Sequence, residues 1–198
     1  MKHLTTLILA LLFTTLSFAQ SHTDEITKNA QSYYDYMTAQ NFDGVLDYMY
    51  PKVFEMAPRA QMKAGMEQMF SSPDMKIEFL SNDVSRVSEE KIVDGITYAA
   101  VFYNSKMKMT FVSEKDKSPE DQKVFLDFMQ ATMNTQFGEE NVTSDIEAMS
   151  LVINMDANMF AIKDPQYEGW KFIGNDDNMK MLVDSIVPES VRTSLIKK

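Results

Sequence analysis

The sequence contains no cysteine among its 198 residues. This absence excludes disulfides, thiolate catalysis and cysteine-based metal sites, and it also excludes a lipid anchor attached to a cysteine after a leader. A chain of this length can bury roughly 70% of its unfolded surface, so it does not need such cross-links. We therefore expect a fold that is held together by an ordinary apolar core.

Histidine and positive charge are also scarce. The two histidines are His3 and His22, and the formal net charge is −10. Because His3 lies in the segment that we expect to be removed, only His22 remains, and we expect it in a frayed N-terminus. A Ser/His/Asp triad or a histidine-rich zinc site is therefore not available. The only basic run is Lys197-Lys198, so the surface should repel nucleic acid and anionic lipid. We expect no metal, no cofactor, no nucleic-acid partner and no membrane insertion.

The N-terminus has the pattern of a secretory leader. Lys2 precedes an apolar run over residues 4–13, and the small-residue pattern Ser17-Phe18-Ala19 follows. The run is well short of the roughly 20 residues that span a bilayer. We expect residues 1–19 to be a cleaved signal peptide, and residues 20–198 to form a single α+β domain exported to the periplasm or the medium.

Three helices are predicted before any strand. Apolar residues recur at helical spacing over 24–39, with Thr23 as a plausible N-cap. A short second helix over 45–50 stops at Pro51, and Pro58 opens a third. A period of two then begins at residue 75, which indicates strands.

The longest predicted strand covers residues 96–111 and follows the turn Asp94-Gly95. Residues 98–103 are apolar or small on both faces, so this half of the strand should be central and covered on both sides. The second half alternates Met107 and Met109 with lysines, which predicts burial on one face only.

A second helical region interrupts the strands. Ser118 is placed as N-cap and Pro119 as the first helical residue, and Gly138 should end this inserted helix. Two further strands are predicted over 149–155 and 159–162, separated by a turn at residues 156–158.

The chain should close with one more strand and a helical tail. A turn before Trp170 leads into a strand over 170–173, which pairs with 159–162 as a hairpin. An amphipathic segment over 179–186 and a helix begun by Pro188 complete the tail. The fold class is therefore α+β, with N-terminal helices packed on an antiparallel sheet.

Two segments carry a resemblance to a known family: Tyr48-Met49-Tyr50-Pro51, which closes the opening helices, and the hairpin from Met159 to Ile173. In these the chain resembles the NTF2-like (SnoaL-like) superfamily. The resemblance implies a cone-shaped curved sheet around an interior cavity. The superfamily includes isomerases, dehydratases, cyclases and members with no known reaction, so it does not fix a function.

The sequence offers ligand-lining candidates but no catalytic residue that can be placed. Our leading hypothesis is a non-enzymatic exported domain whose interior holds an apolar small molecule, and the oligomeric state stays open, a dimer included. The residues that we expect to line the pocket lie on the predicted strands or beside them: Tyr98, Phe102, Tyr103, Met107, Met109, Met149 and Trp170.

Two other functions are weighed against this one. A histidine-free isomerase or hydro-lyase would need a buried carboxylate that faces a tyrosine in a cavity. Copper handling is suggested by 17 methionines, because thioethers are soft ligands for Cu(I). However, the paired methionines occupy positions where periodicity already requires an apolar residue, and methionine fills irregular cores.

Overall fold

The computed structural model describes residues 22–196 and shows an α+β protein. The predicted signal peptide, residues 1–19, lies outside the described residues, so its cleavage stays a prediction. Within residues 22–196, no helix is long and apolar enough to cross a membrane.

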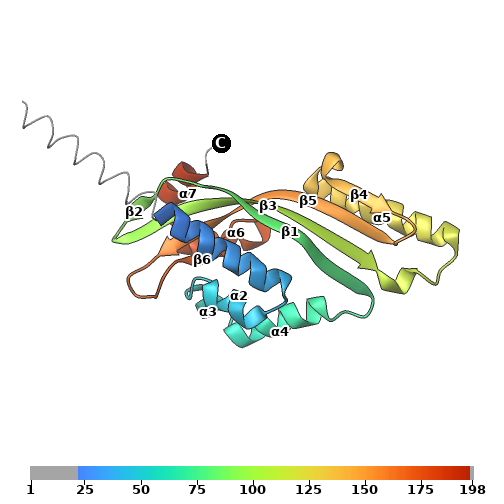
Figure 1. Cartoon of the computed structure of the whole chain (residues 1–198), viewed down its shortest axis with the longest axis horizontal. Coiled ribbons are helices and arrows are strands. Elements are labelled where there is room, and N and C mark those ends of the chain that lie inside the picture. The colour runs from blue at the N-terminus through green and yellow to red at the C-terminus, as the bar shows by residue number, and fades with distance from the viewer. Residues whose placement is uncertain (1–21, 197–198) are drawn as a thin grey trace, which may run out of the picture.

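Six strands form one antiparallel, curved sheet (Figure 1). Its long strands are β1 (Met75–Val87), β3 (Ile96–Phe111) and β5 (Ser150–Lys163), in that spatial order. β2 (Lys91–Val93) pairs with β3, while β4 (Val142–Asp145) and β6 (Lys171–Gly174) pair with opposite ends of β5.

The helices lie before, between and after the strands. An opening helix over residues 22–38 precedes α2 (Phe42–Tyr48), α3 (Val53–Met56) and α4 (Arg59–Phe70). The inserted helix α5 (Pro119–Phe137) separates β3 from β4, and α6 (Lys180–Ile186) and α7 (Glu189–Leu195) form the predicted tail. Short 3-10 turns occupy η1 (Val112–Glu114), η2 (Glu139–Asn141) and η3 (Asp177–Met179).

One end of the sheet is covered on both faces, and we call it the double-covered half. It comprises residues 96–103 of β3, 157–163 of β5, and β6. The opening helix packs on one face, where Ala99 and Val101 point, and α2, α3, α6 and α7 pack on the other, where Tyr98 and Ala100 point. Burial of residues 98–101 on both faces confirms the sequence prediction for this strand.

The other end, which we call the α5 half, comprises residues 104–111 of β3, 150–156 of β5, and β4, with α5 packed on one face. Figure 1 shows α5 and β4 at the end of the molecule away from the other helices. Met107 and Met109 point toward α5, while Lys106 on the opposite face is exposed. One-sided burial is therefore also confirmed.

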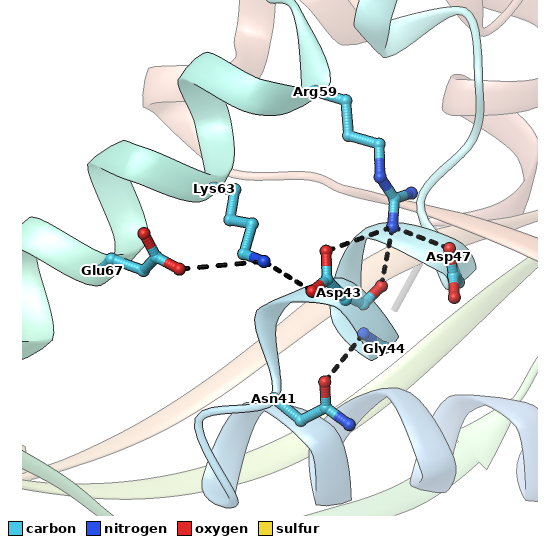
Figure 2. Close-up of polar contacts among 7 residues, drawn as sticks. All are labelled: Asn41, Asp43, Gly44, Asp47, Arg59, Lys63 and Glu67. Atoms are coloured by element: carbon cyan, nitrogen blue, oxygen red, sulfur yellow. Dashed lines mark hydrogen bonds and ion pairs between the residues drawn. The ribbon is translucent and has the colours of Figure 1, made fainter.

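Helix α4 has no fully buried residue, although its Met62 and Met66 pack partly buried against the core, and polar contacts at the surface also join it to α2. Figure 2 shows Asp43 between two cations of α4: Lys63 Nζ lies 2.5 Å from Asp43 Oδ2, and Arg59 donates to the Asp43 backbone carbonyl at 3.0 Å. Arg59 also lies 2.7 Å from Asp47 Oδ1. Hydrogen bonding from Lys63 lowers the pKa of the exposed Asp43 carboxyl.

The structure corrects the sequence prediction for one strand and shows two short strands that were not predicted. The predicted turn at residues 156–158 does not form, because Asp156, Ala157 and Asn158 pair in register with β3 and make β5 one continuous strand. A turn would have cost those three ladder pairs. The short strands β2 and β4 were not predicted, since neither segment is long enough to show a period of two.

Candidate functional site

Helix α5 begins and ends at the residues that the sequence predicts. The Ser118 hydroxyl accepts a hydrogen bond from the Asp121 backbone N–H at 3.2 Å, and Pro119 occupies the first turn, where its missing N–H costs nothing. Gly138 follows the helix with a φ of 93°, which favours glycine. These signals set the ends of α5, while packing against the sheet determines which of its residues are buried.

The inner face of α5 packs on a layer that is rich in methionine, which we call the methionine layer. Its five fully buried residues include Phe111, Leu126 and Leu151. The surrounding apolar side chains are only partly buried, and six of them are methionines: Met75, Met107, Met109, Met129, Met133 and Met155. Unbranched, polarizable side chains of this kind adapt to irregular contacts, so the layer can adjust to a bound group.

The outer face of α5 leaves large apolar side chains in water. Val124 is 65% exposed and Phe128 is 67% exposed. Between them Phe125 reaches inward, and its ring meets the Phe111 ring edge-on with centroids 5.0 Å apart. These side chains border a hollow of about 570 Å³, which is lined by Glu114, Lys117, Asp121, Val124, Phe125 and Phe128. Phe125 therefore links this hollow to the methionine layer.

One ion pair lies at the polar end of this hollow. Glu114 is 9% exposed, and Lys117 Nζ lies 2.8 Å from its Oε2 and 3.0 Å from its Oε1. The two charges of this pair neutralise one another, and the exposed Asp121 adds a further negative charge to the lining.

None of the seven predicted pocket residues lines this hollow. Tyr98 and Trp170 are buried on opposite faces of the double-covered half. Met107 and Met109 lie in the methionine layer beneath α5. Met149 is fully buried at the entrance to β5, with a positive φ of 49°. The fold therefore spreads these five residues over three packing regions.

Phe102 and Tyr103 line a different hollow, between the sheet and the end of the C-terminal tail. Tyr103 also packs against Tyr34 of the opening helix, with ring centroids 4.6 Å apart. Whether any of the seven residues contacts a ligand stays a prediction.

A buried carboxylate that faces a tyrosine is present, as the enzymatic alternative requires. The Tyr50 hydroxyl donates to Asp164 Oδ2 at 2.6 Å, and the backbone N–H of Gln166 donates to Oδ1 at 3.0 Å. Burial raises the pKa of Asp164, but these hydrogen bonds and the charge of Lys52 lower it below its ordinary value. Burial and the bond to Asp164 raise the pKa of Tyr50.

This pair is enclosed rather than presented to a ligand. Asp164 is 2% exposed and Tyr50 is 1% exposed, and both carboxylate oxygens already accept a hydrogen bond. Asp164 begins the turn between β5 and β6, and its backbone carbonyl accepts a bond from Tyr167. The pair joins this turn to the end of α2, which is a structural role.

The methionine pairs weighed for copper lie in three environments. Met107 and Met109 share the methionine layer. Met66 is half-buried beside Met69, which is 47% exposed, and Met181 is 84% exposed. Within residues 22–196, no group of three or more histidine, aspartate or glutamate side chains could hold a metal ion.

Comparison with known proteins found no matching family model, no similar curated protein and no similar solved structure. The resemblance to the NTF2-like superfamily therefore stays a prediction that rests on the two segments quoted above.

Sequence reasoning recognised Val124 and Phe128 only as apolar residues of a helix. A detectable signal was nevertheless present. The inner stripe of α5 runs through Phe125, Met129 and Met133 at a spacing of four, and Val124 and Phe128 repeat that spacing one position earlier. Two adjacent stripes make an apolar arc wider than one sheet face covers, so one of them must face water or a partner.

Proposed function

We propose that this protein is an exported, non-enzymatic domain that binds an apolar small molecule at the hollow beside α5. The observation that carries the proposal is the exposure of Val124 and Phe128 around a hollow that continues, through Phe125, into the methionine layer. Ligand sites combine an apolar wall with polar groups that orient the ligand. Here Val124, Phe125 and Phe128 supply the apolar wall, and Glu114, Lys117 and Asp121 supply the polar side. Large apolar side chains that are exposed together mark binding surfaces.

The ligand class follows from the lining. An acyl chain or an aromatic ring would lie against Val124, Phe125 and Phe128. The Glu114–Lys117 pair is neutral as a whole, so Asp121 is the remaining charge of the lining, and it disfavours an anionic head group. The double-covered half then acts as the rigid scaffold that holds β3 and β5 in place.

The proposal is tested with Nile red, a neutral apolar dye, titrated into the mature protein and followed by fluorescence. Phe128→Gln should weaken dye binding roughly tenfold or more, because burying an aromatic side chain against a ligand contributes on the order of 1.5–3 kcal/mol. The matched control is Ile92→Gln, since Ile92 is 70% exposed on β2 in the other half. Equal dye affinity in wild type and both variants would contradict the site.

Native mass spectrometry of protein purified from its source distinguishes a small ligand from a protein partner. A co-purifying mass of small-molecule size that is lost in Phe128→Gln supports the proposal, and a protein-sized mass would replace it. The same spectra test export, since the mature chain should begin at Gln20 or its cyclised form. An intact product that retains residues 1–19 would contradict secretion.

The copper alternative has its own test. Cu(I) titrated under reducing conditions should find no site tighter than micromolar. Stoichiometric binding that is abolished by Met107→Leu together with Met109→Leu would favour copper, because leucine conserves the apolar volume and removes only the sulfur.

A further inference from the structure

A second hollow lies on the face of the sheet opposite α5, beside the end of the C-terminal tail. Its volume is about 370 Å³. Its lining comes from three neighbouring strands and from the residue that follows α7: Ser85, Arg86, Phe102, Tyr103, Asn104, Asp156, Ala157, Asn158 and Ile196. Nothing in the function proposed above uses this hollow.

Arg86 is the unusual member of this lining. The chain has three arginines, and two of them pair with carboxylates: Arg59 with Asp47, and Arg192 with Asp184. In the part of the chain that the structure describes, Arg86 joins no ion pair, although acidic residues outnumber basic ones by 29 to 19. Its guanidinium instead lies 3.7 Å from the centroid of the Phe102 ring.

Stacking leaves the edges of the guanidinium free. A guanidinium that lies flat on a ring keeps its N–H groups pointing outward in a fixed plane, and this geometry matches the two oxygens of a carboxylate. The aromatic ring also restricts the side chain, so less conformational entropy is lost when an anion binds. Arg86 is therefore prepared to receive a carboxylate.

Asp156 supplies the complementary charge, and it is the only other charged residue of the lining. It lies opposite Asn104 on β3, and Phe102 is two residues away on the same strand. Diagonal neighbours of this kind on one sheet face are about 7–8 Å apart. Because the guanidinium lies over the Phe102 ring, a ligand with adjacent opposite charges can contact Arg86 and Asp156 from the same hollow.

The amides beside these charges complete the site. Asn158 accepts a hydrogen bond from Asn175 through its Oδ1 at 2.8 Å, which leaves its Nδ2 available as a donor. Asn104 is exposed on the same face. A phosphate or a dicarboxylate would be repelled by Asp156, and a simple amine would be repelled by Arg86, so the lining selects a zwitterion.

We propose that this hollow binds a free α-amino acid. The ligand carboxylate accepts hydrogen bonds from Arg86, the ammonium group donates to Asp156, and the amides of Asn104 and Asn158 contact the remaining polar atoms. Ile196 borders the space left for the ligand side chain.

The test is calorimetric titration of the mature protein with each standard amino acid, and with propionate and propylammonium as half-ligands. At least one amino acid should bind saturably, and each half-ligand at least tenfold more weakly. Arg86→Gln and Asp156→Asn should each weaken amino-acid binding tenfold or more. The control is Lys108→Gln. Lys108 lies on the same sheet face outside the hollow and, within residues 22–196, joins no ion pair, so this substitution should leave amino-acid binding unchanged.

Circular dichroism melting of each variant verifies that the fold persists, because all three side chains lie at the surface. The proposal is overturned if no amino acid binds saturably. It is also overturned if propionate binds as tightly as the amino acid and Asp156→Asn has no effect, since the site would then recognise an anion. Neither outcome depends on Phe128 or on the hollow beside α5, so failure of this proposal is distinguishable from failure of the proposed function.

Discussion

The same two strands, β3 and β5, run through two environments in this protein. In the double-covered half, residues 159–162 of β5 are all buried, because helices pack on both faces. In the α5 half, Ile153 is buried while Asn154 is exposed, because only one face has a helix on it. The first half has two dense clusters and the second has partly buried methionines, so rigidity and adaptability are separated along one sheet.

The largest difference should be seen between Trp170→Ala and Met107→Ala. Trp170 is 1% exposed beneath the opening helix, and its Nε1 donates to Glu25 at 3.2 Å, so its removal should cost roughly 3–5 kcal/mol. Met107 is half-buried, and its truncation should cost about 1–2 kcal/mol. Urea denaturation followed by circular dichroism measures both. An unchanged stability for Trp170→Ala would mean that the core assignment is wrong.

Tyr50→Phe probes the polar contact inside the double-covered half. It leaves Asp164 Oδ2 buried without its partner, which should cost about 1–3 kcal/mol. The matched control is Tyr167→Phe, since the Tyr167 ring packs edge-on against Tyr50 with centroids 5.6 Å apart, and the bond from Tyr167 to Asp164 is made by its backbone N–H, which the substitution keeps.

The same variant should also change the response to acid. The pKa of Asp164 is lower in the folded state than in the unfolded state. Its contribution to folding stability is therefore fully present above the unfolded-state pKa and is lost as pH falls through the folded-state pKa. Without the Tyr50 hydrogen bond, the folded-state pKa of Asp164 rises, so the loss of stability should begin at a higher pH. Identical pH profiles of unfolding free energy in wild type and Tyr50→Phe would contradict this account.

Two glycines test how closely the helices are packed. A Cβ on Gly44 would lie 2.6–2.8 Å from ring atoms of Tyr36, whereas a Cβ on Gly65 of α4 would meet nothing within 4 Å. Gly44→Ala should therefore destabilise by about 1–2 kcal/mol, because overpacking outweighs the gain in helix propensity. Gly65→Ala should stabilise by about 0.4–1 kcal/mol. Thermal melting of the two variants tests this expectation. A change of the same sign in both melting temperatures would contradict the close contact at Gly44.

The smallest effect should come from the contacts between α2 and α4. Asp43 is 61% exposed, so Asp43→Asn should change stability by no more than about 1 kcal/mol, and salt should reduce the change further. Comparing wild type and variant at low and high salt by urea denaturation measures this. A larger cost that persists at high salt would mean that α4 depends on these ion pairs more than on packing.

Local signals predicted much of the fold. Ser118, Pro119 and Gly138 defined α5, and Asp94-Gly95 formed the predicted turn before β3, with φ values of 51° and 78°. Burial of residues 98–101 on both faces could be read from the sequence because a strand between two layers has apolar or small residues at every position. The turn predicted at residues 156–158 was wrong, because pairing with β3 on a neighbouring strand outweighed local turn propensity.

The candidate sites were less predictable than the fold. The apolar character of Val124 and Phe128 is visible in the sequence, but their exposure depends on which side of α5 meets the sheet. Arg86 and Phe102 are 16 positions apart in the chain and meet only because β1 and β3 pair in a particular register, shifted by the irregularity between Val84 and Arg86. No local pattern contains that shift.

The sequence by itself determined the α+β class, the ends of α5 and which half of β3 is buried on both faces, since these depend on residues that are close in the chain. Only the tertiary structure decided that β5 is continuous, that Asp164 is enclosed by Tyr50, and that Arg86 faces a hollow without an ion-pair partner. Each of these depends on strand register and on helices that arrive from distant parts of the chain, and a one-residue change of register would move a side chain to the opposite face.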